Sequence, residues 1–152
     1  MDIEQKQKKN SPLFIIILGA LTAIGALSID MFLPGLPELK NDFNTTTANA
    51  QLTLSLFMIG LGLGNLIVGP ISDSIGRKKP LVISMIIFAL ASLGIVFVEN
   101  IWIMVFLRFI QGFTGGAGAV ISRAIASDMY RGNELTKFLA LLMLVNGVAP
   151  VI

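Results

Sequence analysis

Long runs of apolar residues, separated by short polar stretches, set the strongest limit on what this chain can fold into. Four such runs cover residues 13–36, 48–71, 81–98 and 101–124. Each is close to the roughly 20 residues that a helix needs to cross the hydrocarbon core of a bilayer. The sequence therefore predicts an all-α membrane protein with four complete transmembrane helices in one bundle, residues 13–152, preceded by a polar tail, residues 1–12.

A fifth apolar run, residues 138–152, reaches the end of the sequence before it is long enough to span. At 1.5 Å of rise per residue it would extend about 22 Å, against a hydrocarbon core about 30 Å thick. We therefore expect an incomplete fifth helix, and we expect the chain to be a piece of a longer protein.

The composition agrees with a membrane protein and excludes several kinds of site. Hydrophobic residues make up 55% of the 152 residues, charged residues make up 13%, and the mean hydropathy is +0.84. A soluble domain usually carries about 25% charged residues. The sequence contains neither cysteine nor histidine, which excludes thiolate chemistry, disulfides, imidazole bases and ordinary zinc sites. We expect neither an enzyme nor a nucleic-acid-binding protein, because no paired carboxylates occur and the cations form short clusters between apolar runs.

The distribution of lysine and arginine predicts the orientation in the membrane. If the apolar runs are spans, nine cations fall on one side: Lys6, Lys8, Lys9, Arg77, Lys78, Lys79, Arg123, Arg131 and Lys137. Lys40 alone falls on the opposite side. Because loops rich in lysine and arginine stay in the cytoplasm, we expect the N-terminal tail to be cytoplasmic.

The connection between the second and third runs has a pattern that membrane anchoring alone does not need. Gly69 is followed by Asp73, Gly76, Arg77 and Lys78. A small residue such as Gly69 lets two membrane helices approach closely, and Gly76 permits a tight reversal of the chain. Asp73 can bind free N–H groups at a helix end or pair with Arg77. The alternative interpretation is a merely basic turn that keeps this loop in the cytoplasm.

This spaced set of residues resembles the loop signature between the second and third helices of the major facilitator superfamily. In that family the motif is held to latch the two halves of the transporter together on the cytoplasmic side. The resemblance therefore implies a latch role for Gly69, Asp73, Gly76, Arg77 and Lys78. It also implies a twelve-helix fold, of which this chain would be the N-terminal part.

Other segments are similar to the bicyclomycin and chloramphenicol resistance group of drug:proton antiporters within that family. They are residues 28–37 (SIDMFLPGLP), 107–118 (LRFIQGFTGGAG), 122–128 (SRAIASD) and 147–150 (GVAP). One position departs from the pattern: some drug antiporters carry a second acid eight residues before Asp30, where this chain has Thr22. The resemblance covers residues 13–152 and implies proton-driven efflux of small amphipathic drugs, with no cofactor besides the proton gradient.

Asp30 and Arg108 each lie inside an apolar run, where a charge at the bilayer centre costs about 2.5–3.5 kcal/mol on insertion scales. Both lie about 9 Å below the outer ends of their predicted helices. Small and polar residues follow each of them at helical spacing, which indicates faces turned toward the bundle interior. We expect Asp30 to take up and release a proton beside Arg108, with Gln111 in the same cavity. The alternative is a static ion pair that fixes the first helix against the fourth.

Three other polar residues inside the runs, Gln51, Asn65 and Asn146, are expected to make interhelical hydrogen bonds instead of contacting a substrate. The glycines within residues 60–64 and 112–118 are expected to allow close packing of helices. A phosphate-binding role would need strand-to-helix turns, which the sequence does not predict.

The sequence thus predicts the N-terminal part of a proton-coupled exporter of small amphipathic drugs in a bacterial cytoplasmic membrane. Its expected partners are the drug, the lipid bilayer and the C-terminal helices of the longer protein. Two alternatives stay open: a metabolite importer of the same fold, and a truncated membrane protein with no transport of its own. Because alternating access needs two halves that rock against each other, we expect residues 1–152 to be inactive by themselves.

Overall fold

The structure is a computed structural model that describes residues 12–148. These residues form helices and no strand, in the order α2 (Pro12–Asp30), the 3₁₀ turn η1 (Leu33–Gly35), α3 (Leu36–Asp42), α4 (Thr47–Ile75), α5 (Lys78–Val96), α6 (Ile101–Met129) and α7 (Asn133–Val148). Four stretches of the described chain are long and apolar enough to cross a membrane: Leu13–Asp42, Thr47–Ile75, Lys78–Val96 and Ile101–Met129. The predicted all-α membrane fold with four spanning segments is confirmed.

The predicted fifth run, residues 138–152, overlaps α7, which begins earlier than the run does, at Asn133. The last four residues of that run, 149–152, lie outside the described residues, as does most of the predicted tail.

The first predicted run, residues 13–36, is not one continuous α-helix. α2 ends at Asp30, η1 follows after two residues, and α3 begins at Leu36. Pro34 and Pro37 explain the interruption, because proline lacks an N–H group and disfavours the helical conformation in the residue before it. The backbone N–H of Phe32 donates to a carbonyl only three residues back, at 3.0 Å, so the chain tightens immediately after Asp30.

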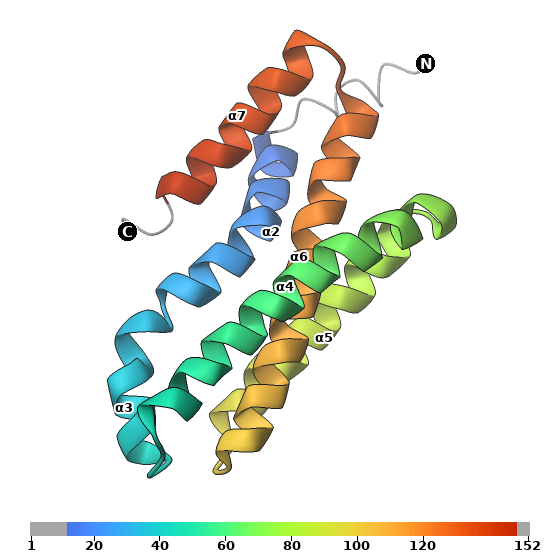
Figure 1. Cartoon of the computed structure of the whole chain (residues 1–152). Helices are drawn as coiled ribbons and strands as arrows, with labels where there is room; N and C mark the ends of the chain where they lie inside the picture. Colours follow the sequence, from blue (N-terminus) through green and yellow to red (C-terminus); the bar gives the residue numbers. More distant parts are fainter. Residues whose placement is uncertain (1–11, 149–152) are drawn as a thin grey trace.

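The connections between helices gather at two ends of the bundle (Figure 1). The α3–α4 and α5–α6 connections lie at one end, termed here the Lys40 end. The α4–α5 and α6–α7 connections lie at the opposite end, termed the Arg77 end. At the Lys40 end, the Thr46 hydroxyl caps α4 by accepting a 3.2 Å hydrogen bond from the Asn49 N–H.

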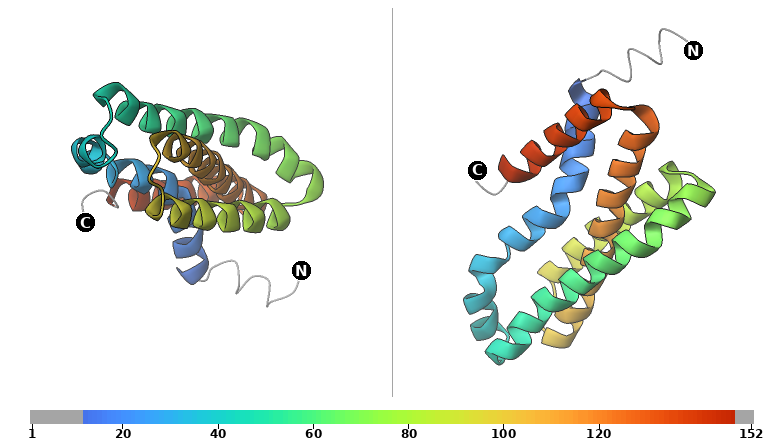
Figure 2. Two further views of the ribbon diagram at one scale, coloured as in Figure 1. Left: turned by 90° about the horizontal axis from the view of Figure 1, so that it is seen from below. Right: turned by 45° about the horizontal axis from the view of Figure 1, so that its top comes forward.

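α6 is the central helix of the described bundle. It lies between α4 and α5 (Figure 2, left) and also contacts α2 and α7. Every residue from 114 to 119 is buried. Near the Arg77 end, an apolar cluster joins α2, α6 and α7; its buried members are Leu18, Ala126, Tyr130, Phe138 and Leu142. The helix that carries Arg108 is therefore held from several sides.

Reciprocal glycines bring the backbones of α4 and α6 into contact. Gly60 and Gly64 of α4, and Gly112 and Gly116 of α6, leave no room for a Cβ atom, which would overlap a carbonyl oxygen of the facing helix. Each pair is spaced by four residues, so its members lie on one face of their helix. Small residues at this spacing are typical of close helix pairs in membranes. The predicted packing role is confirmed for these four glycines, whereas Gly62 has nothing within 4 Å of an added Cβ.

Candidate functional site

Arg108 is buried in α6, on the side of the bundle nearer the Lys40 end. Its relative exposure is 8%, and its guanidinium carbon lies 3.5 Å from the centre of the Phe32 ring. Its Nη1 donates a 2.9 Å hydrogen bond to Oε1 of Gln111, about one turn further along α6. Its Nε is also buried and has no hydrogen-bond partner among the described residues. The guanidinium is thus held by an amide and an aromatic face, with one N–H group left unpaired.

The hydrogen bonding continues from Arg108 across to α5. Nε2 of Gln111 donates to Oγ of Ser92 at 2.8 Å, and the Ser92 hydroxyl donates to the carbonyl oxygen of Phe88 at 2.8 Å. Gln111 is buried and uses both its carbonyl and its NH₂ group, which fixes the orientation of the amide. We refer to these side chains as the Arg108–Gln111–Ser92 network; it links α6 to α5 and orients the guanidinium.

Asp30 is the last residue of α2 and is partly buried. The ion pairs within residues 12–148 all involve Arg77, so the structure does not contain the Asp30–Arg108 ion pair that the sequence left open. Phe32, two residues after Asp30, covers the guanidinium face instead. The alternative of a static Asp30–Arg108 ion pair is therefore not present among the described residues, and the turn that carries Phe32 contacts the guanidinium.

At the Arg77 end, the Arg77 side chain joins α4 to α6. Its Nη1 pairs with the carboxylate of Asp73, one turn earlier, and lies 2.8 Å from Oγ of Ser72. Its Nε donates to Oδ2 of Asp128, near the end of α6, at 3.0 Å. The hydrogen bond with Asp128 is the main cause that raises the pKa of Arg77, burial opposes it, and the charges of Asp128 and Asp73 add to the rise. The pairing of Asp73 with Arg77 is present, and Arg77 bridges two spanning helices as well.

The other residues of the loop motif, Gly69, Gly76 and Lys78, have different structural surroundings. Gly76 makes the reversal between α4 and α5 with φ 92°, a conformation that suits glycine. Gly69, in contrast, does not mark a close approach: an added Cβ would lie 3.5 Å from Cγ2 of Val120, an ordinary contact. The reason is that α4 and α6 are closest at their four facing glycines and diverge toward the Arg77 end (Figure 1). Lys78 begins α5 and is exposed.

Among the described residues, Asn65 and Gln51 do not form the interhelical hydrogen bonds expected of them. Asn65 donates from Nδ2 to the Leu61 carbonyl of its own helix at 2.9 Å. Gln51 is exposed at the rim of a cleft. Asn146 has a side chain outside the described part of the structure. Thr22 is buried and donates to the Gly19 carbonyl at 2.8 Å.

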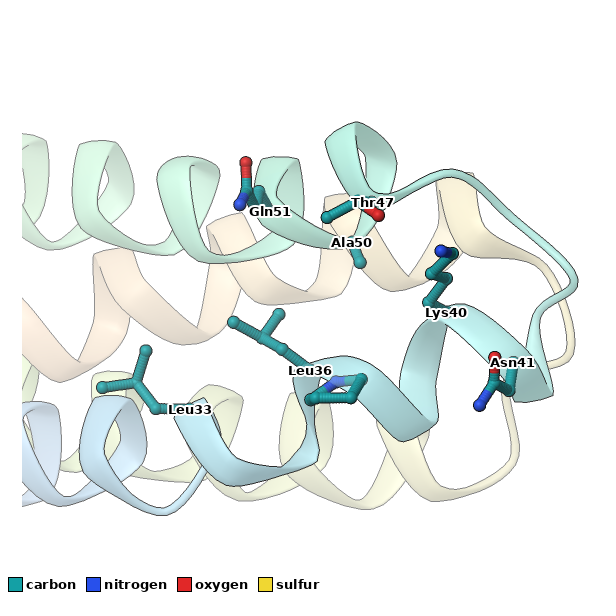
Figure 3. A pocket seen from close by; sticks show the side chains of 8 residues that line it. Leu33, Leu36, Lys40, Asn41, Thr47, Ala50 and Gln51 are labelled. Atoms are coloured by element: carbon teal, nitrogen blue, oxygen red, sulfur yellow. The ribbon is translucent and has the colours of Figure 1, made fainter.

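A cleft of about 530 Å³ opens at the Lys40 end, between α3 and the first turns of α4 (Figure 3). Leu33, Leu36 and Lys40 point from η1 and α3 toward α4. The rest of the lining is contributed by Pro37, Asn41, Thr47, Ala50 and Gln51. The cleft therefore combines apolar walls with one ammonium group and several uncharged polar groups, a mixture suited to an amphipathic molecule.

Three residues that contact the candidate site residues were given no role from the sequence: Phe32, Ser92 and Asp128. Asp128 could have been found, because an acid that follows the fourth predicted helix lies at the same end of the bundle as Arg77. Phe32 follows Asp30 inside the similar segment 28–37, but its contact depends on the turn after Asp30. Ser92 carries no sequence signal that distinguishes it from other serines in apolar helices.

Residues 18–152 match the family model described as Major Facilitator Superfamily. The chain belongs to the major facilitator superfamily. It is therefore part of a multi-pass membrane protein, in agreement with its four spanning segments.

Relatives within the major facilitator superfamily include proteins named for drug resistance. YdgK of Bacillus subtilis, an uncharacterized MFS-type transporter, is 48% identical over 136 residues, covering 90% of this chain and 34% of that protein. A bicyclomycin resistance protein homolog of Haemophilus influenzae is 34% identical over 146 residues, covering 96% of this chain and 37% of that protein. A chloramphenicol resistance protein of Pseudomonas aeruginosa is 29% identical over 143 residues, covering 91% of this chain and 34% of that protein. The predicted resemblance is confirmed, and the chain spans about a third of the length of these relatives.

Proposed function

We propose that this chain is part of an exporter of small amphipathic drugs, driven by the proton gradient across a bacterial cytoplasmic membrane. The observation that carries the proposal is the Arg108–Gln111–Ser92 network, a polar cluster buried between spanning helices and covered by the segment that follows Asp30. A charge at the bilayer centre costs about 2.5–3.5 kcal/mol on insertion scales, and intramembrane charges commonly mark transport pathways. The names of the Haemophilus and Pseudomonas relatives support a drug as the transported substrate.

In the proposed cycle, Asp30 carries the proton and Arg108 stabilises the deprotonated carboxylate. Burial disfavours a charged carboxylate and a nearby cation favours it, so the proton affinity of such an acid changes when its distance from the cation changes. In this structure Arg108 contacts Gln111 and Phe32 and forms no ion pair with Asp30. A movement of Phe32 off the guanidinium would let the two charges approach and would favour proton release.

We further propose that the Arg77 end faces the cytoplasm. We also propose that the ion pairs of Arg77 with Asp73 and Asp128 stabilise one conformation of the transporter. Arg77 already connects α4 with α6, so any motion that separates these helix ends must break its contact with Asp128. The exposed carboxylate of Asp73 is then available to helices contributed by the rest of the transporter. The driving force is the proton gradient, and no bound cofactor is proposed.

The test compares full-length protein containing this chain with residues 1–152 alone, in a drug-sensitive bacterium that lacks its own pumps. We expect the full-length protein to extrude a fluorescent drug in energised cells, and to stop when an uncoupler collapses the gradient. Energy-dependent accumulation of the compound would instead support an importer. Residues 1–152 alone are expected to extrude nothing, because the second half needed for alternating access is missing.

A further inference from the structure

An apolar groove of about 660 Å³ lies between α4, α5 and α6, in the half of the bundle nearer the Arg77 end. α6 lies between α4 and α5 (Figure 2, left), and residues within the range 109–114 of α6 contribute to the lining of the groove. Its walls carry exposed branched side chains, namely Ile67, Ile71 and Ile75 of α4 and Ile83 and Ile87 of α5. The lining is apolar apart from Ser84 and Thr114, and the Thr114 hydroxyl bonds to the Ile110 carbonyl of its own helix at 2.9 Å.

The length of the groove matches one leaflet of a bilayer. Along α4 its lining extends from Leu63 to Ile75, which is about 18 Å at 1.5 Å per residue. One leaflet contributes about 15 Å to a hydrocarbon core about 30 Å thick. The groove is therefore about as long as one extended acyl chain of a leaflet.

Two exposed cations lie in the chain connection between two residues that line one end of the groove. Ile75 and Pro80 both line it, and the residues that connect them are 76–79. Of the three cations in this connection, Arg77 is already paired with Asp73 and Asp128. Lys78 and Lys79 are exposed and form no ion pair within the described residues.

We propose that this groove is a binding site for an anionic phospholipid, with an acyl chain along the isoleucines and the phosphate bound by Lys78 and Lys79. The two lysines select for negative charge, since clusters of basic residues beside membrane helices attract anionic headgroups. The apolar walls select for an acyl chain. A second protein helix in the groove would contact the apolar walls but would leave the ammonium groups of Lys78 and Lys79 without a partner. This inference is independent of the proposed drug export.

The site can be tested on the full-length protein that contains this chain, purified in detergent and titrated with phosphatidylglycerol or phosphatidylethanolamine during native mass spectrometry. We expect phosphatidylglycerol to remain bound at lower lipid concentration. The double variant Lys78→Gln/Lys79→Gln should weaken its binding roughly thirtyfold, from about 1 kcal/mol per basic residue near an anionic surface. The matched control is Arg131→Gln/Lys137→Gln, which removes two exposed cations at the same end but away from the groove, and should leave binding unchanged.

A second pair of variants tests the acyl chain separately from the headgroup. Ile71→Trp fills the groove and should weaken phosphatidylglycerol binding, whereas Leu66→Trp, at an exposed position of α4 outside the lining, should not. Glycerol 3-phosphate, which carries the charge without the chains, should not compete. Equal binding of the two lipids, competition by glycerol 3-phosphate, or a dimer of the chain that Ile71→Trp abolishes would each overturn the proposal. The lysine variants change only exposed side chains, so they remain decisive if Ile71→Trp fails to fold.

Discussion

The ring of Phe32 lies against the guanidinium of Arg108, with 3.5 Å between the ring centre and Cζ. Phe32 follows the end of α2 at Asp30 by two residues, whereas Arg108 is fixed in the central helix α6 by Gln111. The contact therefore connects the conformation of the turn after Asp30 to the surroundings of the buried cation. Desolvated contacts between a cation and an aromatic ring are worth about 2 kcal/mol.

Phe32→Ala should lower the stability of the bundle by about 2 kcal/mol, because it removes the aromatic face from a buried guanidinium. The measurement is the unfolding midpoint of the purified chain in detergent micelles. Phe106→Ala is the matched control, since Phe106 also lies on an apolar helix but is 62% exposed. Equal shifts for the two variants would show that the Phe32–Arg108 contact contributes nothing specific.

Gly64→Ala and Gly112→Ala should each destabilise the chain by about 1–3 kcal/mol or more, the usual cost of forcing extra atoms into a packed interface. The reason is that each added methyl would overlap a backbone carbonyl, which cannot move aside as a side chain can. Thermal unfolding in detergent measures the effect. Gly62→Ala is the control on the same helix, because it meets nothing within 4 Å, and it should leave the midpoint unchanged or slightly raised.

Gln111→Leu should lower the free energy of unfolding by about 1–3 kcal/mol or more, because it leaves Nη1 of Arg108 buried without an acceptor. Thr114→Val tests the same stretch of α6 while removing only a hydroxyl that bonds to its own helix. We expect this control to have a much smaller effect on the unfolding midpoint. A similar loss in both variants would argue against a structural role of the Arg108–Gln111–Ser92 network.

A double-mutant cycle with Arg77→Gln and Asp128→Asn should give a coupling free energy of at most about 1 kcal/mol, because exposed ion pairs are screened by water. The side chain of Asp128 is 56% exposed and that of Arg77 is 23% exposed. Since Asp128 raises the pKa of Arg77, the stabilisation from this shift is fully present below the ordinary arginine value and is lost only as the pH rises through the raised value. The coupling measured at pH 7 and pH 9 should therefore agree, and a large difference between them would contradict this assignment.

Much of the fold follows directly from the sequence, because long apolar runs can be buried in a membrane in few ways. The four facing glycines were also predictable, since their spacing of four residues places each pair on one helix face. The break after Asp30 was not predicted, although Pro34 and Pro37 carried the signal, because the run of apolar residues continued across it. Its consequence, the contact of Phe32 with Arg108, depends on how two distant segments pack and has no local signature.

One contact among the candidate site residues follows from helical spacing, whereas the others depend on tertiary packing. Arg108 and Gln111 are one turn apart on α6, so helical spacing alone brings them together. The pairing of Arg108 with Asp30 rested on equal depth in the membrane, which does not fix the direction in which either side chain points. Asp128 illustrates the reverse case: membrane topology placed it at the Arg77 end, and only tertiary structure shows that it binds Arg77.

The most direct test of proton-coupled export is the Asp30→Asn variant of the full-length protein, reconstituted in vesicles with an imposed proton gradient. Asparagine keeps the shape of the side chain but cannot exchange a proton, so we expect normal expression and a complete loss of gradient-driven drug movement. Drug-dependent proton flux, followed with a pH-sensitive dye, should disappear with it. If the variant moves drug and protons at the wild-type rate under the same gradient, Asp30 does not carry the proton and the account of its role is contradicted.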